Sequence, residues 1–241
     1  MKNIALIFAG GIGKRMNSNG IPKQFLKLYG KEIIIYTLEI FEKNNDIEGI
    51  IVSCLEEKIS CLKYLIKKYD LKKIRSIIAG GKTGQESIYN GLCEVEKYYS
   101  QGDIVLIHDG VRPLINEKTI EDNILSVKKY GSAITTVPAI ETIIEVEKEK
   151  HKIKNILKRS ECYMARAPQS FYLKDILDAH RKAIKENKND FIDSASMMAY
   201  YGYKLNIING PVENIKITTP LDYYIFKAIQ DMKENMNIFG F

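Results

Sequence analysis

The sequence predicts an α/β fold: a Rossmann-like, mostly parallel sheet with helices on both faces and an extruded β-hairpin arm. Short, almost continuous apolar runs alternate with amphipathic segments of helical length, and glycine-rich or charged motifs follow directly after several runs. Apolar strands separated by helices are typical of parallel sheets that are covered on both faces. A chain of 241 residues is long enough to build one such domain around a substantial core.

The first part of the chain carries the alternation most clearly. Strands are expected at residues 4–9, 49–54, 74–79, 104–109 and 132–137. The helices between them are expected around residues 34–43, 58–69, 85–99 and 117–129. Sheets of this kind bind ligands at the carboxyl ends of their strands. We therefore expect the functional site where the motifs at 10–15, 80–87 and 109–112 follow the first, third and fourth strands.

The alternation breaks between residues 138 and 159. Two apolar stretches, 143–147 and 153–157, flank a highly charged turn at 148–152, a pattern that predicts a β-hairpin. A lone hairpin is only marginally stable in water, so this arm should pack against something. Either a second subunit or the hairpin's own domain could provide that surface.

The remainder of the chain returns to the alternating pattern. Helices are expected at 173–186 and 193–201, the second with Asp193 as its N-cap and Gly202 as its stop. A strand is expected at 203–208, and Thr219 and Pro220 should open the last helix. We expect a loose tail at 235–241. No repeat or linker is visible, so residues 1–241 are interpreted as one domain with the arm at 138–159.

A glycine-rich turn and two cations point to a phosphate site. Gly10, Gly11 and Gly13 follow the first strand, and Arg15 and Lys23 lie just beyond them. Backbone N–H groups combined with fixed positive charge are well suited to binding a polyphosphate. The spacing fits neither GxxxxGK[ST] nor GxGxxG. A purely structural turn is the alternative, and the two cations favour the phosphate site.

Composition narrows the possible partners. The net charge of +6 suits anionic small substrates, and no dense Lys/Arg block with interleaved aromatics indicates nucleic-acid binding. The cysteines show no CxxC spacing, which disfavours a zinc site or a disulfide framework and favours free thiols in a reducing compartment. No stretch is long enough to span a membrane, and the N-terminus lacks a cleavable signal, so we expect a cytoplasmic protein.

Five ordered motifs carry a family resemblance. They are AGGIGKRM with PKQF, Gly80-Gly81 with Ser87, HDGVRP at 108–113, APQSF at 167–171 and NIKIT at 214–218. The chain resembles the cytidylyltransferases that make CDP-alcohols, including the 2-C-methylerythritol 4-phosphate and ribitol 5-phosphate enzymes. The resemblance implies transfer of CMP from CTP to a small polyol phosphate, with Mg²⁺ as cofactor and pyrophosphate as the second product. AGGIG, PQSF and ITTP favour the ribitol-phosphate branch.

The residues themselves suggest several of the roles. Asp109 ends the fourth strand and suits Mg²⁺ coordination, with a cap or turn as the alternative. Lys216 is expected on the inward face of a short strand, which is unusual for an unpaired lysine; a snorkelling surface lysine is the alternative. Because the attacking phosphate is already ionised, no general base is required, and His108 is interpreted as structural.

The resemblance assigns the remaining roles. It implies that Arg15, Lys23 and Lys216 are catalytic. It places CTP against Ala9, Gly10, Gly11, Gly13, Gly80, Gly81, Ser87 and Asp109. It places the acceptor against Arg112, Thr142 and Arg159. In the related enzymes the arm crosses to a second subunit, so a homodimer is expected in which the arm contributes Thr142 and Arg159.

Four departures from the family pattern bear on the substrates. Gly84 stands where arginine is common, Glu141 where the methylerythritol enzymes have aspartate, and Ala167 and Ile192 where threonine is usual. The lost hydroxyl groups favour ribitol 5-phosphate or another linear polyol phosphate over 2-C-methyl-D-erythritol 4-phosphate as the acceptor. A sugar-1-phosphate nucleotidylyltransferase and an inactive nucleotide-binding or assembly protein are the alternatives. The retained cations disfavour an inactive protein.

Overall fold

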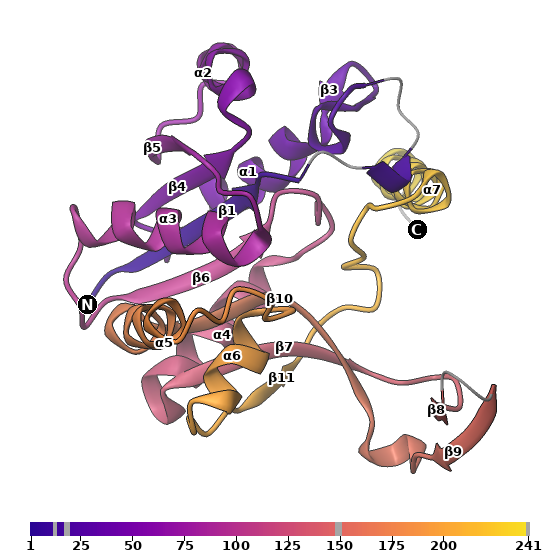
Figure 1. The fold of residues 1–241 in the computed structure, drawn as a ribbon. Helices are drawn as coiled ribbons and strands as arrows, with labels where there is room; N and C mark the ends of the chain where they lie inside the picture. Colours follow the sequence, from indigo (N-terminus) through magenta and orange to yellow (C-terminus); the bar gives the residue numbers. More distant parts are fainter. Residues whose placement is uncertain (12–13, 17–19, 148–150, 240–241) are drawn as a thin grey trace.

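The computed structural model describes residues 1–11, 14–16, 20–147 and 151–239. Within them a 7-stranded sheet has the strand order β11-β7-β10-β6-β1-β4-β5 (Figure 1). Its strands are β1 (Asn3–Ala9), β4 (Gly49–Cys54), β5 (Ile74–Ala79), β6 (Ile104–Asp109), β7 (Ser132–Pro138), β10 (Tyr163–Tyr172) and β11 (Ile207–Asn209). The predicted strands at 49–54, 74–79 and 104–109 agree with β4, β5 and β6.

The sheet is mostly parallel, as predicted. β1 pairs in parallel with β4 and β6, β4 with β5, and β11 with β7. The exception is β10, which the sequence analysis did not assign as a strand and which runs antiparallel to both β6 and β7. Its ladder with β7 is interrupted between Ala165 and Gln169.

Helices cover both faces of this sheet. α1 (Ile33–Lys43), α2 (Ile59–Lys68) and α4 (Glu117–Tyr130) pack on one face, and α3 (Gly84–Glu96), α5 (Leu173–Lys185) and α6 (Ser194–Tyr200) on the other (Figure 1). In β1, Ala5 and Ile7 join the first of these cores while Ile4 and Leu6 join the second. Because side chains alternate along a strand, a strand buried on both faces must be apolar at every position.

The ends of the helices follow the local sequence signals. Asp193 caps α6: its side-chain carboxylate accepts a hydrogen bond from the backbone N–H of Ser196 at 2.8 Å. In return, the hydroxyl oxygen of Ser196 accepts a hydrogen bond from the backbone N–H of Asp193. Gly202, just beyond α6, has a φ of +82°, the left-handed conformation that glycine adopts without strain. Both agree with the sequence prediction.

A separate two-stranded antiparallel sheet forms the arm. Its strands are β8 (Ile144–Glu147) and β9 (Lys152–Ile156), and residues 148–150 of the predicted turn lie outside the described residues. Every residue of both strands is exposed, and Figure 1 shows the hairpin extending away from the central sheet. The hairpin is confirmed, and it does not fold back on its own domain.

The C-terminal helix α7 (Pro220–Phe239) corrects one prediction. The tail was expected to be loose from residue 235, yet α7 continues through residue 239, and residues 240–241 are not described. Phe226 of α7 is fully buried against a small core that includes Leu28, Ile33 and Ile217. This packing stabilises the first half of α7, and the helix continues beyond it.

Two predicted strands are also corrected. Of the predicted strand at 203–208, only the last two residues belong to β11, which runs from Ile207 to Asn209. Tyr203 and Leu205 are not part of the sheet and pack instead on the core formed with α5 and α6. Residues 214–218, which carry Lys216, form no strand; the N–H of Ile217 instead donates to the carbonyl oxygen of Val111 at 2.9 Å.

Short elements complete the fold. They are the strands β2 (Lys27–Leu28) and β3 (Lys31–Glu32), and the 3-10 turns η1 (Lys14–Met16), η2 (Lys23–Phe25), η3 (Glu56–Lys58) and η4 (Arg159–Glu161). Over the described ranges, none of the helices combines the length and apolar character that crossing a membrane requires.

Candidate active site

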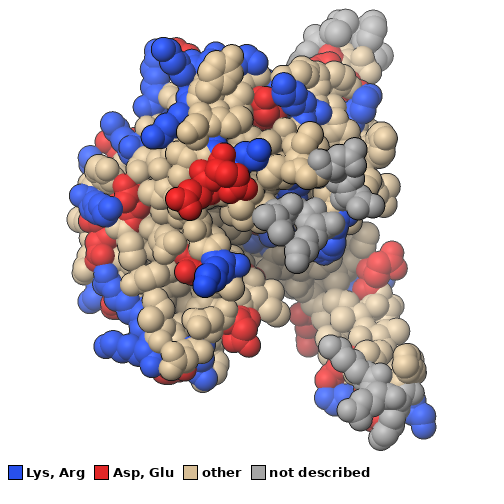
Figure 2. Space-filling view, turned by 45° about the horizontal axis from the view of Figure 1, so that its top comes forward, with Lys and Arg blue, Asp and Glu red and all other residues tan. Residues whose placement is uncertain are grey.

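Two adjoining cavities lie where β1, β5 and β6 end. The smaller, about 210 Å³, is lined by the turns after β1 and β5 together with Lys23 and Gln24. The larger, about 590 Å³, lies toward α3, β10 and the residues before α6. Asp109 and Lys216 line both cavities, so they lie at the border between them. Figure 2 shows a hollowed region of this face in which Lys and Arg side chains gather.

Ser87 lies close to both glycine turns of the smaller cavity. Its hydroxyl accepts from the N–H of Gly81 at 2.9 Å and donates to the carbonyl oxygen of Thr83 at 2.8 Å. A Cβ added at Gly10 or Gly80 would come within 2.9 Å of the Ser87 Oγ. Only glycine therefore allows the two turns to approach this serine so closely.

The structure thus brings most of the predicted nucleotide-binding residues together. Those lining the smaller cavity are Ala9, Gly10, Gly11, Gly81, Ser87 and Asp109. Gly80 also lies close to Ser87. Gly13 lies outside the described residues. Gly84 lines both cavities, and a side chain at this position would meet open space.

Gln24 is a residue that the sequence analysis missed. Its buried side-chain amide donates to the carbonyl oxygens of Ala9 at 2.5 Å and Gly11 at 3.1 Å. These bonds fix the start of the glycine turn and hold η2, with Lys23, beside it. The sequence did contain Gln24, in the PKQF motif between Lys23 and Phe25. These three residues form η2, in which Gln24 and Phe25 are buried.

Lys23 is the most strongly perturbed cation of the site. Burial, together with the nearby positive charges of Lys216 and Arg15, lowers its pKa to about 8. A lysine in this state is still mostly protonated at neutral pH but loses its charge far more easily than a surface lysine. The Arg15 side chain is exposed and lines neither cavity.

Asp109 at the end of β6 connects two further cations. The Nζ of Lys216 lies 2.5 Å from its Oδ1, and the Nε of Arg112 donates to its Oδ2 at 2.7 Å. Burial alone would raise the pKa of this carboxyl, but Lys216 and Arg112 together hold it well below its usual range. The carboxylate therefore stays ionised and positions both cations.

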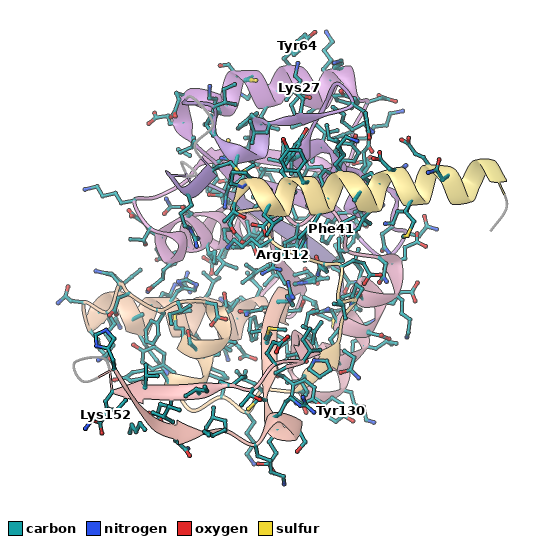
Figure 3. All side chains as sticks on the ribbon, turned by 90° about the vertical axis from the view of Figure 1, so that its right-hand side faces the viewer. Lys27, Phe41, Tyr64, Arg112, Tyr130 and Lys152 are labelled. Atoms are coloured by element: carbon teal, nitrogen blue, oxygen red, sulfur yellow. The ribbon has the colours of Figure 1, made fainter. Side chains whose placement is uncertain are left out.

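Asn214 and Arg166 extend this network and were also missed. Arg112 donates from Nη1 to the carbonyl oxygen of Asn214 at 2.9 Å, and Arg166 reaches the same oxygen from its Nη1 at 3.4 Å. The buried Asn214 side chain donates to the carbonyl oxygen of Ala167 at 2.7 Å. In Figure 3, Arg112 lies near the middle of the molecule, whereas Lys152 lies on the outlying hairpin.

The arm residues are not brought to this site within one chain. Thr142 and Arg159 are exposed and line neither cavity. Among the described residues, the side chain of Arg159 forms one hydrogen bond, from Nη1 to the carbonyl oxygen of Ile140 in its own arm at 3.3 Å. Glu141 is likewise exposed on the arm. By contrast, Ala167 and Ile192, the other two departures from the family pattern, both line the larger cavity.

His108 takes no part in the cavity lining. It is fully buried, packs against Phe41, and its Nε2 lies 3.2 Å from the carbonyl oxygen of Arg112. Burial lowers its pKa to about 4, so the ring is neutral at physiological pH. The geometry agrees with a structural histidine.

Comparison with known proteins supports the resemblance. Residues 3–231 match the family model described as IspD, 2-C-methyl-D-erythritol 4-phosphate cytidylyltransferase. A ribitol-5-phosphate cytidylyltransferase from Vibrio parahaemolyticus is 52% identical over 238 residues, which cover 99% of this chain and 100% of the relative. A 2-C-methyl-D-erythritol 4-phosphate cytidylyltransferase from Clostridium novyi is 41% identical over 229 residues, covering 95% of this chain and 96% of the relative.

Solved structures agree on the fold. The 2-C-methyl-D-erythritol 4-phosphate cytidylyltransferase of Francisella tularensis superposes with a TM-score of 0.75 at 28% identity, covering 94% of this chain and 100% of that one. A 4-diphosphocytidyl-2C-methyl-D-erythritol synthase from Anaerococcus prevotii gives a TM-score of 0.82 at 24% identity, covering 95% and 96%. Since the family model spans residues 3–231 and its relatives match from end to end, this chain belongs to the 2-C-methyl-D-erythritol 4-phosphate cytidylyltransferase family.

Proposed function

We propose that this chain transfers CMP from CTP to ribitol 5-phosphate, giving a CDP-polyol and pyrophosphate. The observation that carries the proposal is the cationic border between two cavities, where Lys216 lines both and Lys23 lines the smaller. One cavity has the glycine turns expected for a nucleotide, and the other has room for a second anion. The 52% identical relative carries the name of the same reaction.

The chemistry of the transfer explains why the site holds cations and needs no nucleophilic side chain. An oxygen of the acceptor phosphate forms a bond to the α-phosphorus of CTP, and the bond from that phosphorus to the β-phosphate oxygen breaks. Both reactants are anions, so positive charge and alignment lower the barrier. We assign Lys23 and Arg15 to the triphosphate and Lys216 to the transferred phosphoryl group.

Mg²⁺ is the proposed cofactor, and Asp109 fits it as a single protein ligand. Within the described part of the chain no group of three His, Cys, Asp or Glu side chains could hold a metal by itself. Magnesium commonly binds through one or two carboxylates together with substrate phosphates, and Asp109 is an ionised carboxylate facing both cavities. The bound ion would neutralise charge on the triphosphate.

Ribitol 5-phosphate is favoured over 2-C-methyl-D-erythritol 4-phosphate as the acceptor by the larger cavity. Ala167 and Ile192 line it without hydroxyl groups, so a substrate that relies on two threonines there would lose its partners. Arg112 lines the same cavity and is assigned to the acceptor phosphate. Relatives with the ribitol-phosphate name are 48% to 52% identical, against 41% for the methylerythritol relative from Clostridium novyi.

A homodimer is proposed to complete the acceptor site. The arm exposes apolar side chains on both of its strands, among them Ile144, Val146 and Ile153. Such a hairpin gains stability by packing on another surface. A second copy of the chain would cover it and would receive Thr142 and Arg159 from the arm. A single domain with a dimerising arm at 138–159 follows from this arrangement.

The compartment proposed for this reaction is the cytoplasm. All four cysteines are free thiols, which suits a reducing environment. Fractionation of the producing cells, followed by a blot for the chain, tests this assignment. Recovery of the chain with the membrane or secreted fraction would contradict it.

The decisive experiment is a panel of donors and acceptors. Pyrophosphate release is measured with CTP, UTP, ATP and GTP beside ribitol 5-phosphate, other linear polyol phosphates and 2-C-methyl-D-erythritol 4-phosphate, with Mg²⁺ present. We expect CTP with ribitol 5-phosphate to give the highest kcat/KM. Preference for a purine nucleotide, or faster turnover of methylerythritol phosphate than of every linear polyol phosphate, would refute the proposal.

A further inference from the structure

Arg166 is a half-buried arginine in the larger cavity with no acidic partner. No carboxylate of the described residues forms an ion pair with it, and its Nε is buried without a hydrogen-bond acceptor. Among the described residues its one hydrogen bond, at 3.4 Å, goes to the carbonyl oxygen of Asn214, which already accepts from Arg112 at 2.9 Å. The donors of this guanidinium are therefore largely unused in the protein alone.

The charged group that acts on Arg166 is another cation, Arg112. Arg112 and Lys216 line the same cavity and share the carboxylate of Asp109. Asp190 and Asp193 also line this cavity, and neither forms an ion pair with Arg166. Burial and the neighbouring charge of Arg112 lower the pKa of Arg166, as expected for two cations held close together. Two guanidinium groups converging on one neutral carbonyl form an arrangement that an anion would relieve.

The position of Arg166 depends on an irregularity in β10. The ladder between β10 and β7 is interrupted between Ala165 and Gln169, so Arg166 stands in the break and lines the cavity. Further along the strand, Gln169 lies against β6 and donates from its side chain to Asp193 at 2.9 Å. Arg166 therefore lies between two parts of β10, at Ala165 and at Gln169, that are both paired with β7.

We infer that Arg166 binds the phosphate of the acceptor together with Arg112, as a second arginine of the acceptor site. The inference rests on the proposed function for the identity of the acceptor. A phosphomonoester carries the charge and the number of oxygens that two guanidinium groups can engage at once. A hydroxyl of the polyol would leave the repulsion between Arg112 and Arg166 in place, so the phosphate is the favoured partner.

The test compares Arg166→Gln, Arg166→Lys and the control Arg75→Gln. Arg75 is an exposed arginine on the edge strand β5 and lines neither cavity. Calorimetry measures binding of ribitol 5-phosphate and of inorganic phosphate to each protein, and kinetics give the KM for each substrate. The wild-type reaction is run in parallel, so an inactive wild type would count against the proposed function alone.

Loss of a charge-assisted contact should weaken phosphate binding by about tenfold or more. We expect R166Q to lose that affinity for ribitol 5-phosphate and for inorganic phosphate, with the KM for CTP unchanged. R166K should recover part of it because the charge remains, and R75Q should match the wild type. Unchanged binding of both ligands in R166Q would overturn the inference. Loss confined to ribitol 5-phosphate would overturn it too, since Arg166 would then contact the polyol chain.

Discussion

The ammonium group of Lys216 lies 2.5 Å from the carboxylate of Asp109, although the two residues come from distant parts of the chain. Asp109 ends β6, while Lys216 belongs to the irregular segment before α7. The pair places a lysine at the border of both cavities, where a phosphoryl group passing from one substrate to the other would be. The Nζ of Lys216 also lies 5.7 Å from the ring centroid of Phe8 and makes a cation–π contact with this ring.

Replacing Lys216 with alanine should lower kcat by about 10²–10³-fold, because one preorganised charge aimed at the transition state is lost. Lys204→Ala, at an exposed lysine that lines neither cavity, is the matched control and should keep the wild-type rate. Steady-state kinetics and thermal melting are measured on both proteins. If K216A melts much earlier while its folded fraction keeps its rate, Lys216 is structural.

The pH dependence of kcat/KM for CTP should report the loss of the proton from Lys23. Since its pKa is lowered to about 8, the free enzyme carries this charge below pH 8 and loses it as the pH rises through that value. We expect kcat/KM for CTP to fall above about pH 8. Lys23→Arg keeps the charge, because arginine does not deprotonate in this range, and should shift the falling limb to higher pH. An identical limb in wild type and K23R would exclude Lys23 as its source.

Asp109→Ala should cost stability as well as activity. The Arg112–Asp109 pair is buried, with side-chain exposures of 10% and 7%, so removing the carboxylate leaves an uncompensated buried cation. The free energy of unfolding should fall by about 3–5 kcal/mol in denaturant titrations without ligands. Asp122→Ala breaks an exposed pair with Lys118 and should cost less than about 1 kcal/mol. Equal losses in the two variants would contradict the structural role of Asp109.

A shared acceptor site predicts complementation between inactive variants. Lys216→Ala removes the chain's own lysine, and Arg159→Ala removes the arginine offered by the arm. In a mixed dimer one site would contain both wild-type residues, so random exchange should restore about a quarter of the wild-type activity. Native mass measured before and after deleting residues 145–155 provides the companion test. No recovery on mixing, or a fully active monomer, would refute the shared site.

The strands and their carboxyl ends could be predicted because burial on both faces leaves a clear signature. β1, β4 and β6 read as apolar runs, and the motifs after β1, β5 and β6 could be placed at one edge of the sheet. The contact of Gly10 and Gly80 with Ser87 follows from that placement. Local sequence was sufficient wherever the packing was regular.

Residues whose position depends on irregular backbone could not be predicted. β10 contains Pro168 and changes from exposed to buried along its length, so it shows neither alternation nor a continuous apolar run. Arg166 lines the larger cavity from the break in this strand, and Asn214 is positioned by a turn before α7. Likewise, the local sequence did not predict that α7 extends to residue 239.

The break in β10 also affects how this enzyme can change over time. Ala165 to Gln169 marks a stretch where the ladder to β7 is interrupted, flanked by residues that hold the strand in the sheet. Residues within such a gap have no partner directly opposite on β7, so a substitution there disturbs no cross-strand side-chain pair in that ladder. Arg166 and Ala167 both fall in this gap and both line the larger cavity. If the larger cavity holds the acceptor, as proposed, a focused library at these two positions should change acceptor preference while the central sheet remains intact.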